Sequence, residues 1–311
     1  MTWNERVMRR CGVSVGRENV YYLERAVKQF IRKYSPTAVT FWGRLTTQSR
    51  DYYVLKVQME ARESEEEMTE DHESEGGNGI NKDIYYVSSD ILQVEEWVRL
   101  PVITSRQMRE AREVKCILTG DLNAKMVCSP PFSGTEKEYL KAQIVRIDHC
   151  CQLVVSGEYK VKSEEEEEVD ESVFAEIEKE EEVKVREEEY RREKRNWVHL
   201  YPNILRQGRV SHQELKYAED DDMEEEEKEK MRKYAVSMDP YEERLKSIVH
   251  DNVKGENMWI QRLHGDAHQS IHPLTSRVTS EQVMSLQSRV WPGFTLFSYQ
   301  DQHFSIYMGD G

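Results

Sequence analysis

Apolar positions near the start of the chain first follow the period of a helix and then the alternation of strands. Residues 18–34 place apolar side chains three and four positions apart and end shortly before Pro36, which predicts an amphipathic helix. Residues 37–45 and 51–58 are rich in β-branched and aromatic side chains, and five polar residues separate them. This pair of segments predicts a β-hairpin.

Further along the chain, five segments have the composition of strands. Residues 84–87 and 91–98 each combine β-branched, aliphatic and aromatic side chains and predict two strands. Residues 153–161 contain a serine–glycine break and predict a short hairpin. Two aromatic segments near the end, 293–299 and 303–308, predict the closing strands of the fold.

Two capping boxes mark the starts of two helices in the middle of the chain. In each box a threonine is followed three positions later by a side chain that can return a hydrogen bond to the threonine backbone. Thr104 with Gln107 predicts a helix to about residue 118, and Thr135 with Glu138 predicts a helix to about residue 147.

Together these elements predict an α+β fold in which mixed strands and helices are interrupted by long acidic inserts. The inserts are expected to be disordered or to form exposed helices, because their composition buries too little apolar surface to become ordered. The predicted organisation is a helical segment at 1–36, a first α+β part at 37–162 with an acidic insert at 60–80, an acidic insert or exposed helix at 163–195, and a second α+β part at 196–311 with an acidic insert at 219–233.

The charge of the chain is concentrated in the inserts. The 311 residues carry a net charge of −15, but residues 60–75, 161–195 and 219–233 alone carry −8, −8 and −5. The remainder is therefore mildly basic, at +6. A surplus this thin does not form the clustered basic stripe of a nucleic-acid binder, so nucleic-acid binding is not expected.

Composition also indicates the compartment. No apolar run approaches the ~20 residues of a membrane span, and residues 1–10 are polar and basic, unlike a secretory signal. The five cysteines are scattered without a C-x-x-C pair, which is typical of a reducing compartment. We therefore expect a soluble intracellular protein that binds no membrane.

Two groups of residues were considered for chemistry. His264, His268 and His272 lie four apart and would align on a helix as metal ligands, but neighbouring glycine and proline disfavour that helix, so a polar loop is the favoured interpretation. Cys150 and Cys151 fall at a predicted helix C-terminus, where the partial negative charge opposes a reactive thiolate, and they are interpreted as buried structural cysteines. We predict no catalytic, cofactor-binding or metal site and no enzyme.

A more unusual feature is the repeated placement of a large ring beside glycine or proline. Such residues act either as plain core and turn anchors or as anchors of a lasting protein interface. The candidates for one or both roles are Trp42, Gly43, Trp97, Pro101, Gly120, Pro130, Pro131, Phe132, Tyr139, Trp197, Gly208, Trp291, Pro292 and Gly293.

These motifs resemble, in order, those of the radial spoke head protein family, in its type 4/6 branch. The resemblance covers about residues 37–309 and rests on several motifs in register: Trp42-Gly43-Arg44, Trp97 to Val102, Leu118 to Ala124, Ser129 to Gly134, Asn196 to His199, and Val290 to Phe294.

The resemblance implies a non-catalytic structural subunit of the radial spoke head, in the axoneme of cilia or flagella. Such a subunit supports spoke-head assembly and passes contact with the central apparatus towards dynein regulation, and hence cilium movement. Implied partners are a like or identical spoke-head subunit, as a homo- or heterodimer, other spoke-head and stalk proteins, and, transiently, the central apparatus. The alternative is a cytoplasmic adaptor or assembly factor for axonemal complexes.

Overall fold

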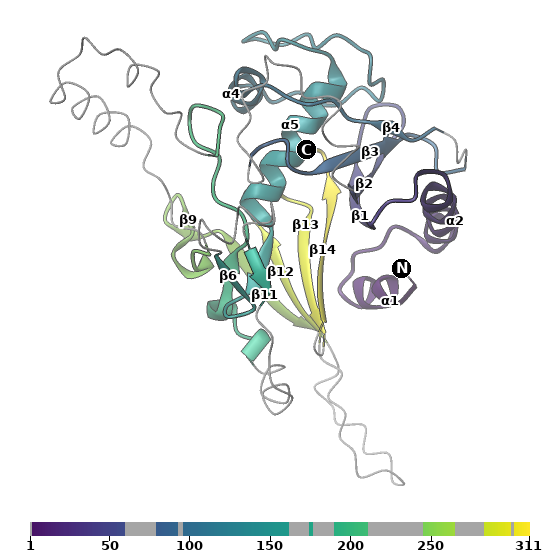
Figure 1. The fold of residues 1–311 in the computed structure, drawn as a ribbon. Coiled ribbons are helices and arrows are strands. Elements are labelled where there is room, and N and C mark those ends of the chain that lie inside the picture. The colour runs from purple at the N-terminus through teal and green to yellow at the C-terminus, as the bar shows by residue number, and fades with distance from the viewer. Residues whose placement is uncertain are drawn as a thin grey trace, which may run out of the picture.

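One large mixed sheet organises the molecule (Figure 1). The computed structural model describes residues 2–59, 79–92, 96–161, 174–176, 190–210, 245–264, 283–299 and 302–311. Its eight-stranded sheet has the order β11-β12-β13-β14-β1-β2-β3-β4. The strands are β1 (Ala38–Leu45), β2 (Tyr52–Gln58), β3 (Ile84–Ser88), β4 (Val98–Arg99), β11 (Trp259–His264), β12 (Val283–Ser288), β13 (Phe294–Tyr299) and β14 (Gln302–Gly309).

The first and the last strand along the chain pair in the middle of this sheet. β1 and β14 pair in parallel, with Gly43 opposite Tyr307 and Leu45 opposite Gly309. Every other neighbouring pair in the sheet is antiparallel. Strands from before and after the long acidic region therefore share one continuous hydrogen-bonded sheet.

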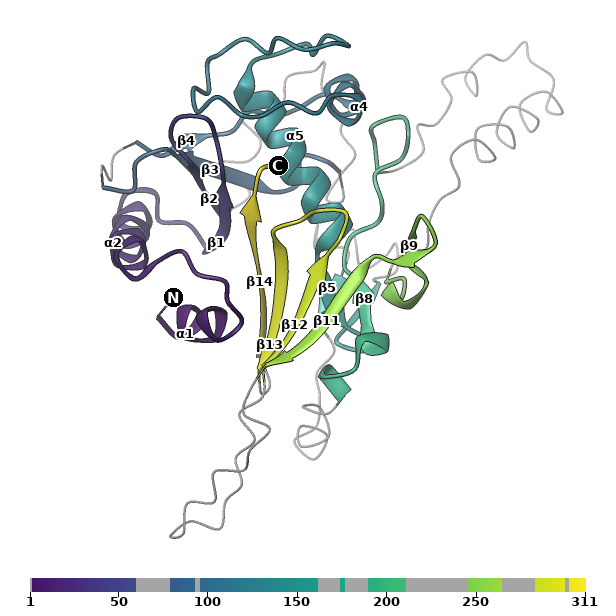
Figure 2. The same cartoon turned by 180° about the vertical axis from the view of Figure 1, so that it is seen from behind.

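Helices cover both faces of the sheet (Figures 1 and 2). On one face, α4 (Ser105–Glu113) and α5 (Glu136–Cys151) form a core cluster with side chains such as Tyr52 and Val54 of β2. On the other face, α1 (Thr2–Arg10) and α2 (Arg17–Tyr34) form a second cluster with the alternate residues of the same strand, such as Tyr53 and Leu55. The strand pattern is therefore apolar on both sides, as expected of a sheet buried between two layers.

Short sheets and turns complete the side of the molecule next to β11. The pairs are β5 (Leu153–Val155) with β8 (Trp197–His199), β6 (Tyr159–Val161) with β7 (Phe174–Glu176), and β9 (Asn252–Val253) with β10 (Glu256–Asn257). Two short 3₁₀ helices, η3 (Lys194–Asn196) and η5 (Ile248–His250), flank β8 and β9.

The predicted α+β class is confirmed, and several elements lie where the pattern placed them. The predicted helix at 18–34 is α2, and the hairpin at 37–45 and 51–58 is β1 and β2. The closing strands at 293–299 and 303–308 are β13 and β14. Almost all of the acidic inserts at 60–80 and 219–233, and most of 163–195, lie outside the described residues.

Three expectations were wrong. In each segment, a side chain or a distant strand forms the backbone hydrogen bonds that the predicted element would have made. Of the predicted strand at 91–98, residues 91, 92, 96 and 97 are described and lie in no strand, whereas 93–95 lie outside the described residues. The Asp90 carboxylate accepts from the Leu92 amide at 2.9 Å and sets a turn, and Val98 begins the two-residue strand β4. The helix predicted to residue 118 ends at Glu113, because the Tyr139 hydroxyl bonds the Val114 carbonyl and the Cys116 amide and holds that segment extended.

The predicted hairpin at 153–161 was the third. β5 pairs with β8, about 40 residues further along the chain, and β6 pairs with β7. In addition, the pattern analysis did not find α1, β11 or β12.

None of the helices in the described ranges combines the length and the apolar character needed to cross a membrane.

Candidate functional site

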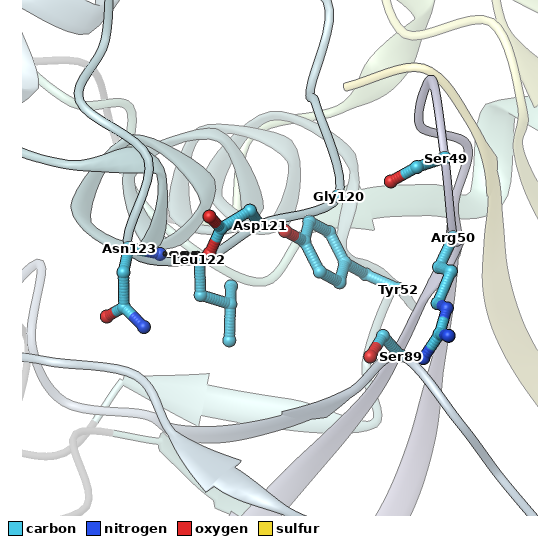
Figure 3. Close-up of a pocket in the computed structure, with 8 residues that line it drawn as sticks. All are labelled: Ser49, Arg50, Tyr52, Ser89, Gly120, Asp121, Leu122 and Asn123. Carbon is cyan, nitrogen blue, oxygen red and sulfur yellow. Dashed lines mark hydrogen bonds between the residues drawn. The ribbon is translucent and has the colours of Figure 1, made fainter.

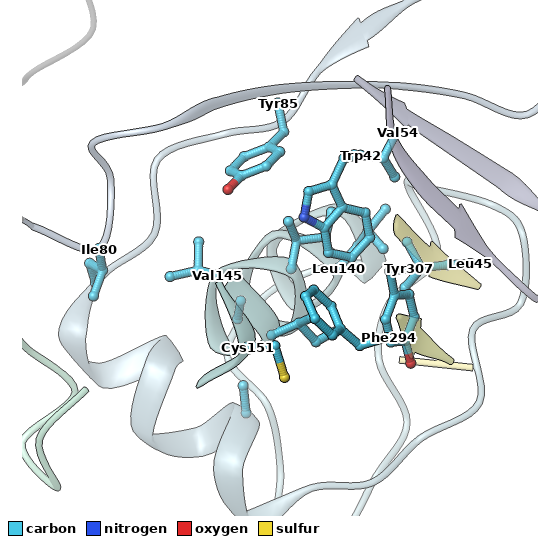
Figure 4. Packing of buried hydrophobic residues seen from close by; sticks show 14 of the residues in the cluster. Trp42, Leu45, Val54, Ile80, Tyr85, Leu140, Val145, Cys151, Phe294 and Tyr307 are labelled. Carbon is cyan, nitrogen blue, oxygen red and sulfur yellow. The ribbon is translucent and has the colours of Figure 1, made fainter. Parts of the chain in front are cut away.

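The aromatic motif residues converge on α5 from several elements. Trp42 lies at an irregularity of β1, between Phe41 and Gly43, where the pairing with β2 shifts. Its ring packs on Tyr307 of β14 with centroids 5.3 Å apart (Figure 4). Its Nε1–H donates to Asp148 Oδ1 of α5 at 2.6 Å. One side chain therefore ties both central strands to the helix that covers them.

Gly43 allows the parallel pair of β1 and β14 to approach closely. Its φ is +156°, and a Cβ at this position would lie 2.1 Å from the Tyr307 carbonyl oxygen. A separation this short cannot be relieved by a rotamer change, because the obstacle is backbone. The glycine of the Trp42-Gly43 motif thus sets the geometry of the pair formed by the first and the last strand.

α4 holds the loop that contains Pro130, Pro131 and Phe132. Gln107 Nε2 donates to the Ser133 carbonyl at 2.9 Å, and the Ser133 amide donates to Glu110 Oε2 at 2.7 Å. The Phe132 ring is buried and meets Tyr139 of α5 edge-on at 5.5 Å, whereas the two prolines are exposed.

A second set of motif residues anchors the later part of the chain. Trp197 of β8 is fully buried, and its Nε1–H donates to the Arg191 carbonyl at 2.9 Å. Gly208 packs against the N-terminus of α4, where a Cβ would lie 2.2 Å from the Ser105 carbonyl oxygen.

The remaining motif residues lie on both faces of the sheet and on the surface. Trp291 is half-buried, and the Arg146 guanidinium of α5 stacks over its ring at 5.0 Å, while Pro292 and Gly293 form the turn into β13. Trp97 is buried on the opposite face, edge-on to Phe30 of α2, with centroids 6.1 Å apart. Pro101 is half-buried just after β4.

The structure thus places the rings of Trp42, Trp97, Phe132, Tyr139 and Trp197 in the core, and places the Pro130–Pro131 and Pro292 corners at the surface. A role of any of them in an interface stays a prediction.

A buried ionic cluster lies between the sheet and α5, and sequence reasoning did not find it. Lys56 Nζ of β2 is 2.7 Å from Asp83 Oδ2 and 3.2 Å from both Asp148 Oδ2 and the Tyr201 hydroxyl. The Tyr85 hydroxyl donates to Asp148 Oδ2 at 2.5 Å. The available signal was a lysine inside the otherwise apolar strand 52–57, a position where a charge requires buried partners.

The electrostatics of this cluster follow from burial and from pairing. Burial opposes the charged form of Lys56, but Asp148 and Asp83 outweigh it and raise the pKa of Lys56. Burial raises the pKa of Tyr85, and the neighbouring Asp148 carboxylate raises it further. Lys141 of α5 donates to the Asp83 carbonyl, and burial lowers the pKa of Lys141 to about 7.

A second buried carboxylate closes the N-terminal end of α5. Glu136 is fully buried and accepts from the Tyr52 hydroxyl at 2.7 Å, the Thr119 amide at 2.8 Å, the Thr119 hydroxyl at 2.6 Å and the Gly120 amide at 2.9 Å. All four bonds go to the oxygens of one side chain. The carboxylate is therefore a satisfied structural acceptor.

A shallow pocket of about 340 Å³ opens beside this carboxylate (Figure 3). Its lining comes from the β1–β2 turn, β2, the end of β3 and the loop after α4: Ser49, Arg50, Tyr52, Ser89, Gly120, Asp121, Leu122 and Asn123. Several of its polar groups are paired within the protein. Ser49 Oγ donates to the Thr119 carbonyl at 2.6 Å, and Asp121 Oδ1 accepts from the Asn123 amide at 3.0 Å. The first of these bonds holds the two loops together.

The histidines and cysteines considered for chemistry are placed as follows. His264 lies in β11, and its Nε2 is 2.9 Å from Ser285 Oγ, whereas His268 and His272 lie outside the described residues. Cys150 and Cys151 end α5, with Cys151 buried and Cys150 half-buried. Within the described ranges, no group of three or more His, Cys, Asp or Glu side chains could hold a metal ion.

These observations define a class of protein: an α+β scaffold with one mixed sheet between two helical layers. Its buried aromatic side chains pack in the core, and its buried Lys56 pairs with buried carboxylates.

Comparison with known proteins gives the family. The chain belongs to the radial spokehead-like protein family, because the family model described as radial spokehead-like protein matches residues 1–76 and 70–311. The chain is 30% identical to radial spoke head protein 6 homolog A of Xenopus tropicalis, over 64% of this chain and 44% of that protein. It is 28% identical to radial spoke head protein 4 homolog A of Homo sapiens, over 96% of this chain and 45% of that protein.

A more distant relative is flagellar radial spoke protein 4 of Chlamydomonas reinhardtii, at 25% identity over 96% of this chain and 64% of that protein. The chain therefore spans between about two fifths and two thirds of the length of the curated relatives it matches.

Proposed function

We propose that this protein is a non-catalytic structural subunit of the radial spoke head in the axoneme of cilia or flagella. The observation that carries the proposal is the family match along almost the whole chain, together with the names of its relatives. The described residues support it, because the motif residues that mark the family are used to build a packed scaffold and not a reaction centre.

The fold suits a part that transmits mechanical contact. The parallel pairing of β1 with β14 joins the first and the last strand of the chain, and the Lys56–Asp83–Asp148 cluster fixes α5 to the sheet from within. Breaking one partner of a buried ion pair is strongly unfavourable, so relative movement of these elements is resisted. A scaffold of this kind would pass contact with the central apparatus towards the stalk and dynein regulation without large internal motion.

The partners that we propose are a like or identical spoke-head subunit and other head and stalk proteins. Contact with the central apparatus is proposed to be transient.

The test is the fate of the tagged protein in cells with motile cilia. A spoke subunit should stay with the microtubules after detergent extraction, and averaged images of axonemes lacking the chain should miss density at the spoke head, with loss of coordinated beating. Recovery of the protein in the detergent supernatant, with intact spoke heads in cells that lack it, would instead favour the cytoplasmic adaptor or assembly factor. A freely soluble fluorescent protein serves as the extraction control.

A further inference from the structure

The N-terminal helices carry a charge opposite to that of the whole chain. Residues 1–36 contain eight lysines and arginines against three glutamates, whereas the net charge of the protein is −15. α1 and α2 bury one side against the sheet through residues such as Leu23, Ala26 and Phe30. Since Leu23, Ala26 and Phe30 are apolar, the cations of α2 are left on its outer side, facing away from the sheet.

The exposed cations lie in line along this outer side. Arg17, Arg25, Lys28 and Arg32 are exposed, and they follow one another at spacings of three, four or eight residues. Positions at these spacings share one side of a helix, so the row extends over about 22 Å at a rise of 1.5 Å per residue. α1 adds further exposed cations through Arg6 and Arg9.

These cations have no counter-charge within the described part of the chain. None of the six makes an ion pair or a side-chain hydrogen bond to another described residue. The acids of the same helices offer little compensation: Glu5 is buried and accepts from Ser14 Oγ at 2.8 Å, Glu24 is half-buried, and only Glu18 is exposed.

Two tyrosines stand within the basic row. Tyr21 is 66% exposed and Tyr22 is 36% exposed, and their rings meet edge-on at 5.7 Å. Exposed tyrosines beside arginines are typical of protein-binding surfaces, where the ring covers apolar stems and the hydroxyl stays available for a hydrogen bond.

We propose that the outer face of α2, formed by Arg17, Tyr21, Arg25, Lys28 and Arg32, together with the exposed Arg6 and Arg9 of α1, binds an acidic, glutamate-rich segment of a partner polypeptide. Five of these six cations are arginines, whose planar guanidinium groups pair with carboxylates through two parallel hydrogen bonds. Glutamates along an extended or helical segment present carboxylates at repeated spacings, which matches a row of cations on one helix.

The observations favour an acidic polypeptide over two other anionic partners, a membrane surface and a nucleic acid. Segments of that chemistry occur in this chain itself, since residues 60–75 hold nine acids and one base, so a like subunit would bring a matching segment. A membrane surface fits poorly, because an interfacial helix needs its apolar side free and the apolar side of α2 lies in the core. The six cations lie on convex helices and not in a groove that would follow a nucleic-acid backbone.

The experiment measures binding of a labelled poly-glutamate peptide to the full chain by fluorescence anisotropy, with poly-glutamine as the uncharged control. We expect saturable binding that weakens as salt is raised from about 50 to about 300 mM, because the pairs are exposed to solvent. Substitution of Arg25→Glu, Lys28→Glu and Arg32→Glu together should lower the affinity about tenfold or more.

The matched control applies the same change of net charge to exposed lysines elsewhere, as Lys115→Glu, Lys125→Glu and Lys254→Glu together. This variant should bind within about twofold of the parent. The neutral variant Arg25→Gln, Lys28→Gln and Arg32→Gln keeps helix-forming side chains, and its affinity for the peptide should lie between those of the two glutamate variants. Thermal unfolding followed by circular dichroism checks that each variant is folded.

Equal losses of peptide affinity in the α2 glutamate variant and in the control glutamate variant would overturn the proposal, because binding would then depend only on the net charge of the protein. So would tighter binding of a single-stranded oligonucleotide or of anionic phospholipid vesicles than of poly-glutamate. Peptide binding that appears only after residues 60–75 and 219–233 are replaced by neutral sequence would also overturn it, because the chain itself would then occupy the face. Each outcome is independent of the proposed axonemal function, which the extraction experiment tests.

Discussion

Lys141 is a buried cation without a carboxylate of its own. Its ammonium group donates to the Asp83 carbonyl and lies 4.3 Å from the centre of the Tyr85 ring, while the nearby carboxylates pair with Lys56. Burial lowers the pKa of Lys141 from 10.5 to about 7, so near neutral pH the side chain exchanges between a charged and a neutral form inside the core.

This depressed pKa predicts how stability changes with pH. Between about pH 7 and pH 10.5 the unfolded chain binds one more proton at Lys141 than the folded chain, so the free energy of unfolding rises with pH, by up to about 1.4 kcal/mol per unit. Lys141→Met should remove this contribution, and its stability relative to the parent should fall as pH rises from about 7.5 to about 9.5. Urea unfolding at several pH values measures the slope.

Lys137→Met is the control on the same helix, because Lys137 is partly exposed. Its stability relative to the parent should be nearly independent of pH over the same range. A Lys141→Met difference that did not change with pH would show that Lys141 is not the titrating group.

Gly43 predicts a second effect at the scale of one residue. Gly43→Ala would place a methyl group 2.1 Å from the Tyr307 carbonyl oxygen, so β1 and β14 must separate. We expect a loss of about 3 kcal/mol or more in the free energy of unfolding, in the range of severe core disruptions. Gly157→Ala is the matched control, because Gly157 also has positive φ but has no neighbouring atom within 4 Å, and should cost about 1 kcal/mol.

At the scale of elements, α4 acts as a clamp for the loop before α5. Its Gln107 and Glu110 side chains bind the carbonyl, amide and hydroxyl groups of Ser133. Both residues lie on the first two turns of α4, whose start is fixed by the Thr104 capping box. The exposed Pro130–Pro131 corner is therefore positioned by α4 as well as by the buried Phe132 ring of the loop.

Removal of this clamp should free the loop. Glu110→Ala leaves the Ser133 amide and hydroxyl without their acceptor, at a cost of about 1–2 kcal/mol, and should speed hydrogen exchange of the Ser133 amide. Glu113→Ala, an exposed site on the same helix, should change stability by less than about 0.5 kcal/mol. Unchanged exchange at Ser133 in Glu110→Ala would contradict the clamp.

The elements that could be predicted from the sequence are those whose signal is local. α2 has a clear apolar stripe, and both capping boxes start helices, so their positions follow from neighbouring residues. The partner of β5 could not be predicted, because β8 lies far along the chain and its three residues have no distinctive period. The ionic cluster around Lys56 escaped prediction for the same reason, since Asp83, Asp148 and Tyr201 come together only when the sheet and α5 have packed.

At the scale of the whole molecule, the division into parts at 37–162 and 196–311 stays a prediction from sequence. The eight-stranded sheet contains strands from both parts. β1 pairs with β14, and α5 packs on strands from both sides of the division, since Leu140 of α5 shares one core cluster with Trp42 of β1 and with Phe294 of β13 (Figure 4). Neither side could bury the face of its central strand alone. Cooperative folding of the whole chain as one unit follows from this arrangement.

Cutting the chain at a point outside the described residues tests whether it folds as one cooperative unit. Fragments 1–183 and 184–311 together retain every described element, but each would expose one edge of the β1–β14 pair and part of the core under α5. Expressed separately, each should be insoluble or lack cooperative thermal unfolding, because exposed edge strands with apolar faces aggregate. Expressed together, they should purify as a one-to-one complex that unfolds in a single transition. A fragment 1–183 that is monomeric, soluble and cooperatively folded by itself would show that the parallel pairing of β1 with β14 is dispensable. The proposed transmission of contact through a single sheet would then lose its structural basis.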